Sequence, residues 1–249
     1  MASEGAAPGS AGERGLVLVQ AVVVVFVAFV AALALASLGA GLLRSAGFER
    51  DGLGMRVGLT VVQFLGFGAG LVAYLQVTEN WDLLRNHVRV PSLRDVGYAV
   101  VGLVTLLGAA AAVGQLLSAL GIEVAQNQVI ALGRENPTFF LYMIPVSLLL
   151  VGPMEELLFR GTVQGLLRRA WGPALAVVVA SALFGVVHWV ALLGTGSKVG
   201  YVAIAAALGL VLGAVYELSD NVAVPAAVHG AYNAVLFGVQ YAMVTGLLG

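Results

Sequence analysis

The chain has 249 residues, of which 60% are hydrophobic and only 10% are charged. Soluble domains have about 25% charged residues, so this composition excludes an ordinary soluble protein and predicts one that crosses a lipid bilayer several times. The formal net charge is −1, without a basic block, so we expect no nucleic-acid partner. The chain contains no cysteine, which excludes disulfides and thiolate metal sites.

Apolar stretches long enough to span a membrane, about 20 residues each, recur along the whole chain. The predicted spans are residues 16–43, 57–77, 97–120, 138–169, 173–193, 200–218 and 222–246. Pro153 lies inside the fourth stretch, and because proline opens or kinks helices, we expect a break there. The fold class is therefore predicted to be all-α, a polytopic membrane bundle of about seven transmembrane helices.

The charges of the connecting segments predict the orientation only weakly. Six basic residues fall on the same side as the N-terminus and five fall on the opposite side. Because cytosolic loops carry the excess of lysine and arginine, the count leans towards a cytosolic N-terminus. We expect a multi-pass protein of a prokaryotic plasma membrane.

Three groups of polar side chains lie inside predicted spans. They are Glu155, Glu156 and Arg160 in the fourth span, His188 in the fifth, and His229 with Asn233 in the seventh. An ionised group at mid-bilayer costs about 2.5–3.5 kcal/mol on insertion scales, so these residues need partners or a function. The structural alternative is that they pair to hold helices together.

The residue types in these groups suit amide hydrolysis. Glu156 and Arg160, four residues apart, share a helix face and can neutralise each other, which leaves Glu155 without a partner on its own helix. An unpaired carboxylate can act as a general base. Neutral imidazoles can bind a metal such as zinc, and a histidine with an asparagine can stabilise an oxyanion.

The depths of the three groups agree only in part. At 1.5 Å per residue, Glu155 lies roughly 20 Å along its helix from Arg169, and His188 lies roughly 22 Å from Pro173. His229 lies only roughly 13 Å from Asp220 by the same arithmetic. We therefore expect the segment before His229 to dip into the protein, which is tolerated where backbone is shielded from lipid.

The same residues carry a family resemblance. The segments "EELLFR" (155–160), "FGVVH" (184–188) and "HGAYN" (229–233) match, in order, the EExxxR, FxxxH and HxxxN motifs. In this the chain resembles the CAAX protease and bacteriocin-processing family of intramembrane proteases, also called the Abi family. That family includes the prenyl-protein endopeptidases of the Ras-converting type. The resemblance covers residues 138 to 245.

The resemblance implies a role for each motif residue. Glu155 would activate the attacking water, and His188 would help to bind that water, directly or through a metal. His229 and Asn233 would stabilise the oxyanion, and Glu156 with Arg160 would form the supporting ion pair. A Zn²⁺ ion, if one is bound, would take Glu155, His188 and His229 as ligands.

The resulting domain organisation has three parts. Residues 1–15 are predicted to be a disordered tail, residues 16–137 the N-terminal transmembrane helices with interfacial linkers, and residues 138–249 the catalytic transmembrane core with its cavity. The expected partners are the bilayer and a lipidated or membrane-associated peptide substrate, and the oligomeric state is open. The alternatives are a non-catalytic scaffold or bacteriocin-immunity protein and a proton-coupled transporter in which Glu155, His188 and His229 form a relay.

Overall fold

The computed structural model describes residues 10–248, so most of the predicted N-terminal tail, residues 1–9, lies outside the described residues. The helices are α1 (Ala11–Ser45), α2 (Leu53–Thr78), α3 (Asp82–Arg85), α4 (Leu93–Ala119), α5 (Gln128–Glu135), α6 (Thr138–Val146), α7 (Gly152–Glu156), α8 (Gly165–Val187), α9 (Lys198–Ser219) and α10 (Ala223–Val244). Two π-helical segments, η1 (Ser147–Val151) and η2 (Leu157–Gln164), and one 3₁₀ turn, η3 (His188–Ala191), join some of them. The strands β1 (Gln126–Asn127) and β2 (Leu192–Leu193) pair antiparallel.

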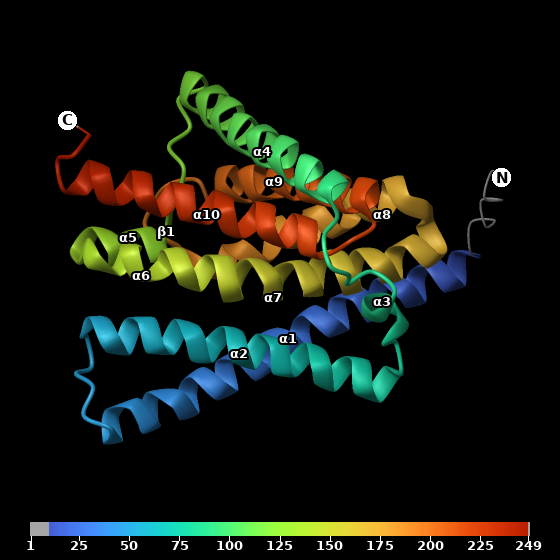
Figure 1. Ribbon diagram of the computed structural model, residues 1–249, viewed down its shortest axis with the longest axis horizontal. Coiled ribbons are helices and arrows are strands. Elements are labelled where there is room, and N and C mark those ends of the chain that lie inside the picture. Colours follow the sequence, from blue (N-terminus) through green and yellow to red (C-terminus); the bar gives the residue numbers. More distant parts are fainter. Residues whose placement is uncertain (1–9, 249) are drawn as a thin grey trace.

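Helices α1 and α2 form an antiparallel hairpin along one side of the molecule (Figure 1). Helix α1 begins at Ala11, five residues before the predicted span, because Ser10 and Glu13 form a capping box there. The two helices pack closely at glycines of α2: a Cβ on Gly66 would lie 2.8 Å from the Ala31 carbonyl oxygen. Small residues that let helix backbones approach are typical of membrane helix pairs.

Two helical stretches joined by a kink run from Thr138 to Ala191 and carry two of the predicted spans. The kink is at Gly172, whose positive φ of 73° marks the boundary predicted between residues 169 and 173. The break expected at Pro153 is absent: the backbone stays helical from α6 past Pro153 and into α8, as far as the kink at Gly172. The π-helical segment η1 ends at Val151, two residues before Pro153, and such wide turns accommodate a proline that cannot donate a backbone hydrogen bond.

Within the described residues, five helical segments are long and apolar enough to cross a membrane by length and composition. The count differs from seven for two reasons. The segment Thr138–Ala191 is one of the five although it contains two predicted spans, and α10 is not among them. Polar side chains such as His229, Asn233 and Gln240 lower the hydropathy of α10. The fold is all-α apart from the two short strands, and the protein is an integral multi-pass membrane protein.

Around the central segment, the other helices form two layers. The α1–α2 hairpin lies on one side of α6 and α7, while α9 and α10 lie on the other side and α4 covers both of these helices (Figure 1). One buried cluster joins α1 and α2 to the central segment through Phe67, Leu158 and Phe184. A second cluster joins α4, α9 and α10 through Leu106, Leu212 and Val228. The polar motif residues lie between these layers.

Candidate active site

The first polar group is held on the central segment, where α7 passes into the π-helical segment η2. Glu156 and Arg160 are both 0% exposed, and the Arg160 Nε donates to Glu156 Oε2 at 2.9 Å. The predicted ion pair is therefore present. Glu155 points away from this pair, and its Oε2 is buried without a hydrogen-bond partner.

His229 of α10 lies against both glutamates. Its Nδ1 is 2.8 Å from Glu156 Oε1, and because a carboxylate only accepts, this nitrogen carries the proton that it donates. Its Nε2 lies 3.8 Å from Glu155 Oε2. Glu156 thus accepts from Arg160 on one oxygen and from His229 on the other, which fixes the imidazole with its Nε2 towards Glu155.

Two glycines let the glutamates and His229 come together. A Cβ on Gly152 of α7 would lie 2.8 Å from both the Ala226 carbonyl oxygen and the Gly230 nitrogen of α10. A Cβ on Gly230 would lie 2.9 Å from the Ser147 carbonyl oxygen. Both distances are well below ordinary van der Waals contact, so α7 and α10 touch through their backbones. His229 follows Ala226 by three residues and faces the same helix.

The expected dip before His229 corresponds to a buried turn. Helix α9 ends at Ser219, and Asp220 adopts a left-handed conformation with a φ of 50°. Asn221 is fully buried, and the Val222 backbone nitrogen donates to the His87 carbonyl oxygen at 2.8 Å. The loop around His87 therefore covers the α9–α10 turn and shields its backbone.

His188 reaches the same region from the end of α8. Its Nδ1 is 2.7 Å from the Phe184 carbonyl oxygen, so Nδ1 donates and Nε2 keeps its lone pair in the neutral ring. The Phe184 ring lies between the polar groups: its centroid is 4.6 Å from that of His188, 5.8 Å from that of His229 and 5.3 Å from the Arg160 Cζ. The FxxxH spacing therefore supplies both an aromatic wall and a carbonyl that orients the imidazole.

A cavity of about 710 Å³ brings the remaining members together. Glu155, His188, His229 and Asn233 line it, whereas Glu156 and Arg160 lie behind its wall. The opposite wall comes from the α1–α2 hairpin, and the cavity extends to Arg50 and Asp51 in the connection between those two helices.

Several polar lining residues were not among the predicted site residues. The Asn127 Nδ2 donates to the Tyr201 hydroxyl at 3.1 Å, and both residues line the cavity. Thr60 and Gln63 of α2 line it as well. The available signal was the presence of these two polar residues inside the predicted span 57–77, the same signal that identified His188.

The described residues do not fit a metal ion as they are arranged. Two imidazole Nε2 atoms and the Glu155 carboxylate have the chemistry of zinc ligands. Among residues 10–248, however, no group of three or more His, Asp or Glu side chains is placed so that it could hold a metal. Zinc therefore stays a prediction, and no step below passes through it.

One comparison with known proteins matches the part of the chain that carries the site. Residues 137–235 match a family model described as Type II CAAX prenyl endopeptidase Rce1-like. No curated protein and no solved structure matches the chain. The matched segment runs from the start of α6 into α10 and contains all six predicted site residues. Through this segment, the chain is similar to the Rce1-like family of type II CAAX prenyl endopeptidases, as its three motifs predicted.

Proposed function

We propose that the protein is an intramembrane endopeptidase in which Glu155 activates a water molecule for attack on a peptide bond. The observation that carries the proposal is the unpartnered Glu155 Oε2, buried at the wall of the cavity and 3.8 Å from His229 Nε2. That separation is too long for a direct hydrogen bond, but a single water can bond to both atoms. A buried carboxylate without a hydrogen-bond partner destabilises the protein, so its presence here is best explained by a bound water that it activates.

The reaction follows from the groups on the cavity wall. Glu155 Oε2 takes a proton from the water, and the resulting hydroxide oxygen bonds to the carbonyl carbon of the substrate. The carbonyl oxygen becomes an oxyanion. When the carbon–nitrogen bond breaks, Glu155 returns the proton to the leaving amine. The products are a new carboxyl terminus and a new amino terminus, so the carboxylate ends as it began.

The other polar residues support these steps. The Asn233 amide, one helical turn after His229, donates to the developing oxyanion. The His188 imidazole lines the same cavity, and its Nε2 lone pair can accept the water's second hydrogen in place of the His229 Nε2. Glu156 accepts from both Arg160 and His229, which holds the imidazole towards Glu155. Desolvation of the Glu156 charge is offset because both of its oxygens are bonded.

The substrate we propose is a lipidated or otherwise membrane-associated peptide that enters the cavity from the end lined by Arg50 and Asp51. Those residues follow α1 and so lie across the membrane from the N-terminus. A cavity that opens to the cytosol of a prokaryote, as the resemblance implies, would place the N-terminus outside. That arrangement opposes the weak charge count of six against five.

The test is cleavage by the purified protein of a prenylated CaaX peptide, with the same peptide lacking the prenyl group as a control. Wild type should cleave the prenylated peptide, and Glu155→Gln should not. Equal inactivity of both proteins would favour the scaffold or immunity function. Proton uptake into proteoliposomes that depends on Glu155, without cleavage, would favour the transporter.

A further inference from the structure

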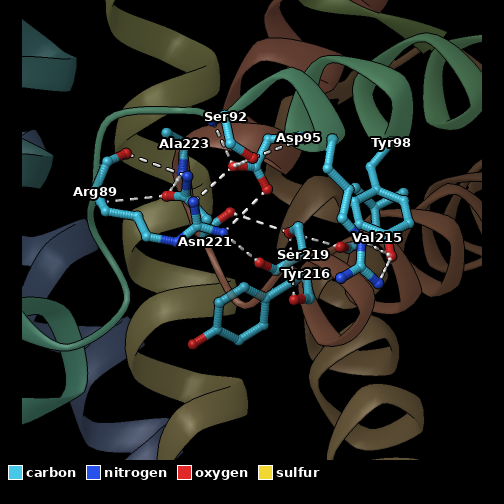
Figure 2. Close-up of polar contacts among 10 residues, drawn as sticks. Arg89, Ser92, Asp95, Tyr98, Val215, Tyr216, Ser219, Asn221 and Ala223 are labelled. Carbon is cyan, nitrogen blue, oxygen red and sulfur yellow. Dashed lines mark hydrogen bonds and ion pairs between the residues drawn. The ribbon is translucent and has the colours of Figure 1, made fainter.

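A polar network at the start of α10, partly buried and partly exposed at Arg89, lies outside the proposed active site (Figure 2). It joins three segments: the loop before α4, the first turn of α4, and the turn between α9 and α10. Its central residues, which we call the α10 latch, are Arg89, Asp95, Ser219 and Asn221. Asp95 and Asn221 are 2% and 0% exposed.

The Asn221 side-chain amide forms a pair of hydrogen bonds with the backbone of the loop before α4. Its Oδ1 accepts from the Arg89 backbone nitrogen at 3.3 Å, and its Nδ2 donates to the Arg89 carbonyl oxygen at 3.1 Å. The same Oδ1 accepts from the Ala223 nitrogen at 3.2 Å, the first residue of α10. One amide therefore fixes the loop and also bonds the first residue of the helix that carries His229, in an Asx turn.

The Arg89 side chain fastens the network to α4 and α9. It bonds both oxygens of Asp95, at 2.6 and 3.0 Å, and donates to the Ser219 carbonyl oxygen at 2.9 Å. Asp95 also accepts from the backbone and hydroxyl of Ser92, at 2.7 and 2.8 Å. The hydrogen bond to Asp95 raises the pKa of Arg89, so the guanidinium stays charged throughout the usable pH range.

The latch fixes the position from which α10 begins. His229 follows Asn221 by eight residues, about 12 Å along a helix, and its bond to Glu156 is 2.8 Å long. A shift or rotation of the first turn of α10 moves His229 relative to α7, since the helix transmits it as a rigid body. Catalytic geometry is sensitive at this scale: a displacement of about 1 Å can cost about 10²-fold in rate.

We propose that the α10 latch is a positioning device for the active site, in which Asn221 and Arg89 set the placement of His229 and Asn233 relative to Glu155. The proposal rests on the proposed peptidase function for its effect on rate. None of the four residues lines the cavity, so the latch acts on the site indirectly, through the helices that it holds.

The experiment compares Arg89→Lys, Asp95→Asn and Asn221→Asp. Lysine keeps the charge but loses the forked pairing with Asp95. Asn221→Asp keeps both acceptor bonds but sets a carboxylate oxygen against the Arg89 carbonyl oxygen. The expected result is at least a tenfold fall in kcat with KM changed less than twofold, and an altered pH profile of kcat. The two milder variants carry the test if Asn221→Asp does not fold.

Arg169→Ala is the matched control. Arg169 bonds Asn80 and Asp82 near the same end of the bundle and does not touch α10. It should leave kcat and its pH profile unchanged, whatever it does to thermal stability. If the latch variants behave like this control, losing stability alone, the latch is a structural clamp and the proposal is overturned.

A second readout separates the latch from the proposed function. Because the chain has no cysteine, a spin label would attach only at cysteines introduced for the purpose. Tyr142 of α6 and Val239 of α10 are both exposed, so Tyr142→Cys and Val239→Cys provide the two labelling sites. The latch variants should shift or broaden the distance between the two labels, and Arg169→Ala should not. If the wild-type protein is inactive, the proposed peptidase function is refuted, but the distance between the labels still tests the positioning role of the latch. An unchanged distance in all three latch variants would refute that role.

Discussion

Gly152 holds α7 against α10, so Gly152→Ala should loosen the contact between Glu156 and His229. The new Cβ would lie 2.8 Å from Ala226 O and Gly230 N, and contacts become ordinary only beyond 3.4 Å. Both partners are backbone atoms, so the helices must separate by about 0.6 Å. That movement lengthens the 2.8 Å bond between His229 and Glu156 beyond a good hydrogen bond.

The expected loss of stability combines two destabilising effects with one smaller stabilising effect. Overpacking costs about 1–3 kcal/mol, and weakening a buried bond to a charged group costs about 1.5–3 kcal/mol. Alanine restrains the unfolded chain and returns about 0.4–1 kcal/mol. We expect a net loss of about 2–5 kcal/mol of unfolding free energy and at least a tenfold fall in kcat.

The assay is reversible unfolding in detergent together with cleavage kinetics, and Gly238→Ala on α10 is the matched control. Nothing lies within 4 Å of a Cβ at Gly238, so this variant should match wild type or be slightly more stable. A Gly152→Ala protein with wild-type stability and kcat would refute the claim that backbone contact between α7 and α10 sets the site.

Further predictions concern the charges and imidazoles. Arg160→Met should cost about 3–5 kcal/mol of unfolding free energy because it leaves Glu156 buried without its cation. Adding Glu156→Gln should recover part of this loss, and a double variant as unstable as Arg160→Met alone would contradict the pairing. His188→Gln should lower kcat at least tenfold at constant KM, and a change in KM alone would assign His188 to substrate binding. Metal analysis tests the predicted zinc: stoichiometric zinc that is lost in His188→Gln would require Glu155, His188 and His229 to move closer together than they are here.

Much of the site was predictable because its residues are polar in apolar surroundings. Glu156 and Arg160 are four residues apart, and this spacing alone predicted their pairing. The position of His229 was harder, because counting along α10 made it too shallow. Counting residues along α10 cannot show that the α9–α10 turn is buried beneath the loop around His87. That burial depends on a contact between segments that are distant in sequence.

Other features depend on tertiary packing that the sequence does not display. Pro153 was expected to break the helix, but the preceding π-helical segment carries the chain through it. The cavity wall from α1 and α2 could not be assigned, since those spans matched only as hydrophobic stretches. The latch residues Arg89 and Asp95 looked like ordinary interfacial charges until the fold placed Asn221 beside them.

The most direct test of the account is peptide cleavage in ¹⁸O-labelled water by wild type and Glu155→Gln at equal thermal stability. The account predicts one ¹⁸O atom in the newly formed carboxyl terminus and a fall in kcat of about 10²–10⁴-fold on loss of the general base. A Glu155→Gln protein that cleaves as fast as wild type would contradict it.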